Sequence, residues 1–204
     1  MEKLLYFYEK PYDLRYPVIC FDERPCQLIG DVIQPIPMLP GVSRRQHYEY
    51  ERKGVCSMFI AVEPLKGFRL TEIKKQRTRE DYAAFMKRLS NLYPDAEKII
   101  LIQDNLNTHF PSSFYKAFDP ETAFDLTRRF KMVYTPKKAS WLNMAEIELS
   151  AFGKQCLNRR IGDIETLEKE VAALTAERNL KRIKIHWSFT KNHARDKFKR
   201  FYTK

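Results

Sequence analysis

The sequence predicts a mixed α/β fold, in which an antiparallel meander of strands is followed by α/β crossovers on the same sheet. Three observations lead to this prediction. Strand-prone segments follow one another as far as residue 74, the apolar period changes to three and four residues after Arg79, and short apolar strands then alternate with helical segments. With 44% hydrophobic and 13% aromatic residues among 204, the chain can bury a sizeable core.

The first part of the chain holds three or four sequential strands. The elements expected there are a short helical start and a loop at 1–16, and strands at 18–23, 27–33, 55–64 and 68–74. Residues 34–54 are rich in proline and charge, so we expect a long irregular connection. Residues 65–67 are a turn between neighbouring strands, and we expect these sequential strands to pair in an antiparallel manner.

The second part alternates helices and strands. Its first helix carries an apolar stripe from Tyr82 to Leu92, begins after Thr78 as a cap and ends before Pro94. The remaining elements are strands at 98–105 and 131–136, two helices within 111–130 broken at Asp119-Pro120, and helices at 141–158 and 164–180.

Charge is the first indication of function. The net charge is +11, with an isoelectric point near 9.5. Residues 181–204 contain nine Lys or Arg and one acid, which accounts for +8 of the total. Such a block either binds a polyanion or is a solvated basic tail. Aromatic residues between the cations, Tyr202 among them, favour anchoring of the segment to the body over stacking on bases.

Several protein classes are excluded by what the sequence contains. Cys20, Cys26, Cys56 and Cys156 are scattered without a CxxC pair, which predicts reduced thiols and neither a disulfide framework nor a zinc site. No apolar run reaches the ~18 residues of a membrane-spanning helix. The first ten residues lack the order of a signal peptide, so we expect a cytoplasmic protein that does not enter a membrane.

Three carboxylates occupy informative positions. Asp22 ends the expected strand at 18–23, Asp104 ends the one at 98–105, and Glu146 lies in the helix after the strand at 131–136. Sites in open α/β sheets form at the carboxyl ends of strands. Carboxylate oxygens are preferred ligands of hard divalent cations, and two Mg²⁺ ions can hold both oxygens of a phosphodiester displacement. Taken singly, Asp22 and Asp104 also suit turns or caps, but together the three favour a metal site.

The local sequence around these acids resembles a known family. FDE at 21–23, DNLNTH at 104–109 and YTPKKASWLNMAEIEL at 134–149 resemble the DDE transposases of the IS630 branch of the IS630/Tc1/mariner superfamily. The ending HWSFTKNHARDKFKRFY is also similar to IS630-type proteins. The resemblance implies an RNase H-like fold and two Mg²⁺ or Mn²⁺ ions. It further implies cleavage of DNA at transposon ends, followed by attack of the freed 3′-hydroxyl on target DNA.

The resemblance also implies roles for individual residues. Asp22, Asp104 and Glu146 would be the catalytic and metal-binding acids, with 41 residues between the last two. Asn143 would position the edge of the active site, or it hydrogen-bonds at a helix start. Asn105 and His109 would support Asp104, although His109 also suits loop packing. The proposed DNA contacts are Arg44, Arg45, Arg52, Lys53, Lys137, Lys138, Lys181, Arg182, Lys184, Lys197, Lys199 and Arg200.

Neighbouring residues are assigned structural roles. Glu148 competes with Glu146 for the role of third acid, but its position two residues further on predicts another helix face. Glu23 is expected on the strand face opposite Asp22. Trp141 is expected to pack against the core, with base stacking as the alternative.

We divide the chain into a lead-in at 1–16, an RNase H-like catalytic domain at 17–180 and a basic aromatic segment at 181–204 packed on it. Relatives carry N-terminal helix-turn-helix modules, for which the residues before Asp22 leave no room. We therefore expect the catalytic half of a split reading frame, an excised portion or a degenerate copy. Expected partners are DNA, a second copy in a homodimer and a separately encoded N-terminal portion. The expected setting is prokaryotic and nucleoid-associated.

Two other functions fit the same residues. An RNase H-like nuclease would use the same acids without strand transfer. A DNA-binding remnant would bind DNA through its charge while its acids remain idle.

Overall fold

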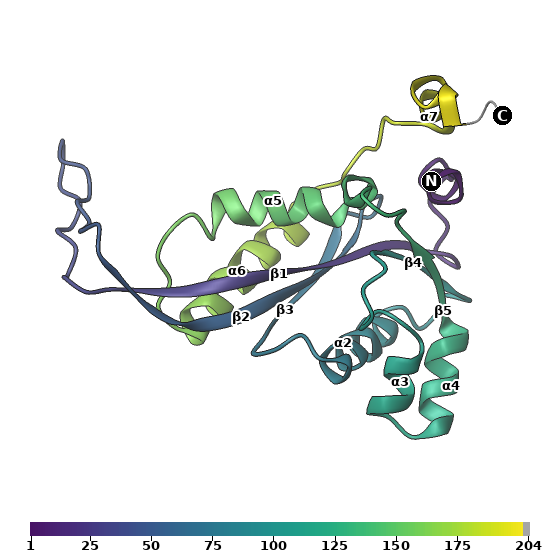
Figure 1. The fold of residues 1–204 in the computed structure, drawn as a ribbon, viewed down its shortest axis with the longest axis horizontal. Coiled ribbons are helices and arrows are strands. Elements are labelled where there is room, and N and C mark those ends of the chain that lie inside the picture. The colour runs from purple at the N-terminus through teal and green to yellow at the C-terminus, as the bar shows by residue number, and fades with distance from the viewer. Residues whose placement is uncertain (202–204) are drawn as a thin grey trace.

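The computed structural model describes residues 1–201, which form a five-stranded mixed sheet with the order β3-β2-β1-β4-β5 (Figure 1). Strands β1 (Val18–Asp31), β2 (Tyr50–Glu63) and β3 (Phe68–Lys74) form the antiparallel meander. Strands β4 (Ile99–Gln103) and β5 (Phe130–Tyr134) are parallel to β1. This arrangement confirms the predicted mixed α/β class and is the RNase H-like fold.

Helices cover both faces of the sheet. One face packs against α2 (Arg79–Asn91), α3 (Ser112–Ala117) and α4 (Pro120–Arg129), and the other against α1 (Glu2–Tyr8), α5 (Ala145–Gln155) and α6 (Ile164–Leu180). Side chains alternate along the strands as the pleat requires. Ile19 and Phe21 of β1 pack on the face covered by α2, α3 and α4, and Cys20 packs on the face covered by α1, α5 and α6.

Helix starts follow the predicted caps. Thr78 and Asp81 form a reciprocal capping box at α2. Asp119 accepts a hydrogen bond from the Thr122 backbone, so the Asp119-Pro120 break predicted from sequence separates α3 from α4. The predicted limits of β3 and α6 agree with the structure residue for residue.

Three expected elements differ from the structure. The strands predicted at 18–23 and 27–33 are one strand, β1, which continues through Pro25. In the described chain, β1 pairs with β4 over Val18–Cys20. Pro25 lies beyond these pairs, so β1 needs no backbone N–H there to hydrogen-bond with β4. Part of the irregular connection, from residue 50, belongs to β2. The helix predicted at 141–158 is a 3₁₀ turn, η1 (Ser140–Leu142), followed by α5.

Residues 32–49 form an arm that extends away from the sheet (Figure 1). Two isolated bridges, Ile36 with Arg45 and Leu39 with Val42, join its two sides. At its base, the Arg160 guanidinium donates hydrogen bonds to the Asp31 carboxylate at 2.8 Å and to the carbonyl oxygens of residues 47–49 at 2.9–3.1 Å. The Arg160 side chain, from the loop after α5, therefore hydrogen-bonds to both sides of the base of the arm.

A buried ion-pair network joins α5, α6 and β3. Glu148 is fully buried, and its two oxygens accept hydrogen bonds from Arg69 at 2.6 and 2.9 Å and from Arg178 at 2.9 and 3.0 Å. Burial raises the pKa of this carboxyl, but the hydrogen bonds from the two guanidinium groups outweigh it and lower the pKa overall. Glu148 is thus a structural residue, as its predicted helix face indicates.

The C-terminal segment lies against the N-terminal helix. Helix α7 (Lys191–Lys197) contacts α1, where Lys191 pairs with Glu9 and Arg195 pairs with Glu2. A short 3₁₀ turn, η2 (Lys199–Phe201), follows, and the predicted contributions of Tyr202 and Lys204 lie outside the described residues. Within residues 1–201, no helix combines the length and apolar character needed to cross a bilayer.

Replacement of Glu148 tests the buried network. We expect Glu148→Gln to lower the free energy of unfolding by about 3–5 kcal/mol, because two guanidinium groups lose their counter-charge. Urea denaturation measures the loss. The matched variant Glu146→Gln, on the exposed side of the same helix, should unfold close to wild type. Equal stability of the two variants would contradict the assignment.

The same network predicts an acid dependence. Because the folded pKa of Glu148 lies below its ordinary value of 4.5, its stabilisation is fully present above that value and is lost as the pH falls through the folded pKa. Urea midpoints measured from pH 6 downward should therefore fall more steeply for wild type than for Glu148→Gln.

Replacement of Arg160 tests the base of the arm. We expect Arg160→Met to speed tryptic cleavage at Arg44 and Arg45 without a comparable loss of global stability, because the arm loses its hydrogen bonds to the body. Arg159→Met is the control, since Arg159 pairs with Glu170 of α6. Unchanged cleavage of the Arg160 variant would show that the arm is held by other contacts.

Candidate active site

Two of the predicted acids lie level with each other on adjacent parallel strands, Asp22 within β1 and Asp104 directly after the end of β4. The last pair in the β1–β4 register joins Cys20 and Ile102, and each strand carries an aspartate two residues later, Asp22 and Asp104. Because the strands are parallel and side chains repeat every second residue, the register brings these two carboxylates to one edge of the sheet. Both side chains are half-buried there.

Glu146 reaches the same edge from the first turn of α5, where it is exposed. The start of this helix is tied to β1 by Asn143, which is almost fully buried. The Asn143 side-chain amide donates to the Phe21 carbonyl oxygen at 2.8 Å and to the Asp22 carboxylate at 3.3 Å. Its own oxygen accepts from the Ala145 backbone at 3.2 Å, so it also hydrogen-bonds at the helix start. Both sequence interpretations of Asn143 therefore describe real contacts.

Asp104 is held by a buried histidine. His109 Nδ1 lies 2.5 Å from Asp104 Oδ1, and its Nε2 lies 3.4 Å from Glu23 Oε2. The ring packs against Phe21 and Tyr82. Burial alone would lower the pKa of His109, but its hydrogen bonds to the two carboxylates raise the pKa to about 9. The histidine both packs the loop and carries positive charge beside Asp104.

The acids perturb one another. Burial, with smaller contributions from the like charges of Glu146 and Asp104, raises the pKa of the Asp22 carboxyl to about 7. Burial acts in the same direction on Asp104, but the hydrogen bond and charge of His109 outweigh it and lower the pKa of that carboxyl. The anionic form of Asp104 is therefore stabilised, whereas the anionic form of Asp22 is destabilised, chiefly by burial.

The donor chemistry fits a hard divalent cation. Asp22, Asp104 and Glu146 offer carboxylate oxygens, and their mutual repulsion is what a bound cation would relieve. As the side chains stand in residues 1–201, no three His, Cys, Asp or Glu groups are arranged to hold one ion. Cation binding at this edge would therefore require movement of the exposed Glu146 side chain or of the half-exposed Asp104.

Comparison with known families shows which family this chain belongs to. The family described as DDE superfamily endonuclease matches residues 17–168, which contain all three acids. This chain belongs to the DDE superfamily of endonucleases. A comparison with curated protein sequences finds no match.

Solved structures similar to this DDE endonuclease domain include those of Mos1 mariner transposase. The catalytic domain of Mos1 matches with a TM-score of 0.59 at 14% identity, over 89% of this chain and 82% of that one. The Mos1 paired-end complex with Mn has a TM-score of 0.59 at 15% identity, and the complex with Mg has 0.60 at 16%. The chain spans 55% of the Mos1 chain in the Mn complex. These matches establish the shared fold.

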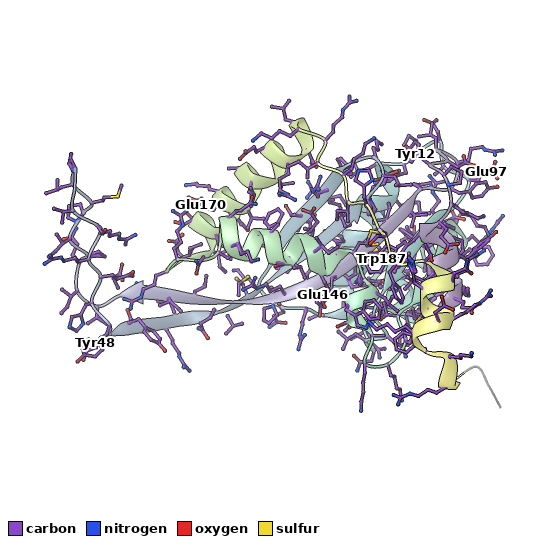
Figure 2. The ribbon with its side chains drawn as sticks, turned by 90° about the horizontal axis from the view of Figure 1, so that it is seen from above. Tyr12, Tyr48, Glu97, Glu146, Glu170 and Trp187 are labelled. Atoms are coloured by element: carbon purple, nitrogen blue, oxygen red, sulfur yellow. The ribbon has the colours of Figure 1, made fainter. Side chains whose placement is uncertain are left out.

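The predicted DNA contacts fall in separate regions. Arg44 and Arg45 lie on the arm, Arg52 and Lys53 lie at the start of β2, and Tyr48 in Figure 2 marks how far the arm is from Glu146. Arg44 pairs with Asp31. Lys137 and Lys138 are exposed in the turn before η1, close to the acids in sequence. The remaining contacts lie on the C-terminal side, where Lys181 pairs with Glu177 and α7 is bound to α1.

Sequence reasoning misjudged two neighbours of the site. Glu23 lies on the face opposite Asp22, as predicted, but it also contacts His109 and Arg77 and so belongs to the surroundings of Asp104. Trp141 was expected to pack against the core, yet 46% of its surface is exposed. It lies in the 3₁₀ turn η1 before α5, where its ring stacks on Trp187. Asn105 is exposed beside Asp104.

Replacement of Asn143 tests how α5 is held. We expect Asn143→Ala to lower the free energy of unfolding by about 1–3 kcal/mol, because the buried Phe21 carbonyl oxygen loses the Asn143 amide as a donor. Asn105→Ala, the same change at an exposed position, should have little effect. Urea unfolding of both variants makes the comparison, and equal values would contradict the tie between α5 and β1.

Proposed function

We propose that this chain is the catalytic domain of an IS630-type DDE transposase, which cuts DNA at transposon ends and joins the freed 3′-hydroxyl to target DNA. The observation that carries the proposal is the convergence of Asp22, Asp104 and Glu146 at one sheet edge, with Asn143 linking α5 to Asp22. Family membership and the fold shared with Mos1 transpososomes support it.

The three acids would hold two Mg²⁺ or Mn²⁺ ions, and Mos1 complexes with both metals support this choice. When bound, such ions stabilise the attacking and leaving oxygens of a phosphodiester displacement. Asn143 would keep the Asp22 carboxylate in place, and His109 would keep Asp104 ionised. The site needs no covalent protein intermediate, because water and then the DNA 3′-hydroxyl serve as nucleophiles.

DNA binding would rest on cations around this edge. Lys137 and Lys138 are placed to contact phosphates near the cut, while the arm and the C-terminal segment carry the other predicted contacts. A homodimer would hold two transposon ends together, as the paired-end complexes of Mos1 do for that protein. A separately encoded N-terminal portion would supply end recognition. The cytoplasmic, nucleoid-associated setting in a prokaryote follows from the same assignment.

Nicking of a supercoiled plasmid in Mg²⁺ or Mn²⁺ tests the acids. We expect Asp22→Asn, Asp104→Asn and Glu146→Gln each to lower the nicking rate at least about 100-fold, because each removes a ligand charge where the phosphate reacts. Asp125→Asn on α4, an exposed carboxylate on the other face of the sheet, should nick as wild type does. EDTA should abolish nicking in every variant. Metal-independent nicking, or nicking by Asp104→Asn, would overturn the proposal.

Strand joining separates a transposase from a nuclease. An oligonucleotide with a free 3′-hydroxyl at a transposon end should become covalently attached to plasmid DNA in the presence of Mn²⁺. The same oligonucleotide with a 3′-deoxy end should not, because it lacks the nucleophile. Nicking without joining would favour the simple nuclease, and salt-sensitive DNA binding without either reaction would favour the DNA-binding remnant.

A further inference from the structure

A partly exposed tryptophan borders the carboxylate of Glu146. Trp141 and Glu146 line the same open hollow of about 560 Å³, which continues along α5 to Lys154 and Gln155. Trp141 exposes 46% of its surface, and Ile147, in the same hollow, also exposes 46%. The hollow therefore combines an apolar floor with a carboxylate at one point and a cation at another.

The tryptophan is backed by a rigid aromatic cluster. Its ring stacks on Trp187 with an interplanar angle of 20° and a centroid distance of 6.3 Å, and Phe189 meets it edge-on at 5.3 Å. Trp187 is itself fixed, since its indole N–H donates to the Phe189 carbonyl oxygen at 2.7 Å and its ring contacts Tyr8. Support from behind keeps Trp141 in place at little further entropic cost on binding.

The surroundings of the ring are positively charged. Lys137 and Lys138 are exposed and precede Trp141 by four and three residues, and Lys154 lies in the hollow. An exposed indole flanked by lysines has the features of a surface that binds unpaired nucleic acid, where the ring takes a base and the cations take phosphates. A stacking surface of this kind must also lie close to the reacting phosphate. Trp141 and Glu146 line the same hollow, so a strand whose phosphate reached the Glu146 carboxylate would lie close to this ring.

We propose that Trp141 is a stacking platform for one unpaired nucleobase of the DNA strand, next to the phosphate that is cut. This inference rests on the proposed function for the position of the strand. Stacking tolerates every base, since each has a π face, so the platform positions the strand without reading its sequence. It selects DNA that is already unpaired or frayed at the cut over a continuous duplex.

Fluorescence of 2-aminopurine, which is quenched when the base stacks, tests the platform. The probe is a forked duplex with one 2-aminopurine in its single-stranded part, bound in Mg²⁺ by the full chain carrying Asp104→Asn so that the DNA stays intact. We expect quenching at one position beside the junction. Adding Trp141→Ala should remove the quenching and weaken binding of the fork by about 5- to 100-fold, whereas Trp141→Phe should retain part of both.

Two controls make the result decisive. Phe124→Ala, which removes an aromatic ring of similar exposure (51%) from α4, should leave quenching and affinity unchanged. Affinity for a fully paired duplex should change less than about twofold in all variants, because paired bases cannot reach the ring. Equal quenching and affinity with and without Trp141 would overturn the platform, even where the Asp104-dependent nicking of wild type upholds the proposed function. Quenching that needs Trp141 in a chain that never nicks would overturn the proposed function and leave the platform standing.

Discussion

Three residue pairs join the two halves of the sheet. Val18, Ile19 and Cys20 of β1 pair in parallel with Ile100, Leu101 and Ile102 of β4, and every other strand is attached to one side or the other of this junction. The antiparallel meander alone contains Asp22, and the α/β half alone contains Asp104. The parallel register brings the two aspartates to the same edge, so the acidic site depends on this short pairing. A shift of one residue would turn one carboxylate to the opposite face.

Burial divides the carboxylates of α5 into two roles. Glu146 and Glu148 are two residues apart, yet one is exposed at the sheet edge and the other is fully buried between two arginines. Charge in the interior is tolerated when it is fully hydrogen-bonded, and Glu148 meets that condition. At the edge, burial raises the pKa of Asp22 to about 7. The site thus keeps a carboxyl group with a raised pKa, whereas the arginines beside the buried Glu148 lower its pKa. Perturbed pKa values of this kind are typical of functional positions.

The basic surface is distributed unevenly around this edge. Cations of the C-terminal segment partly serve structure, since Lys191 and Arg195 bind the acids of α1. Those of the arm lie far from the acids in space (Figure 1). The turn before α5 is where lysines, an exposed indole and a carboxylate occur together. Net charge therefore describes attraction to a polyanion, whereas local geometry decides where the strand would be held.

The element order, most helix limits and the helix caps can be predicted from the sequence, because periodicity, capping and turn chemistry act over a few neighbouring residues. The assignment of Asp22, Asp104 and Glu146 as the acids of the site stays a prediction. The sequence also separated Glu148 from Glu146, since helix periodicity places them on different faces. Only the tertiary structure decided that β1 runs unbroken through Pro25, that Glu23 contacts His109 and that Trp141 is exposed. Each of these depends on segments that are distant along the chain. In the described sheet β1 has no pairing with β4 beyond Cys20. The His109 ring packs on Phe21, and Trp141 stacks on Trp187.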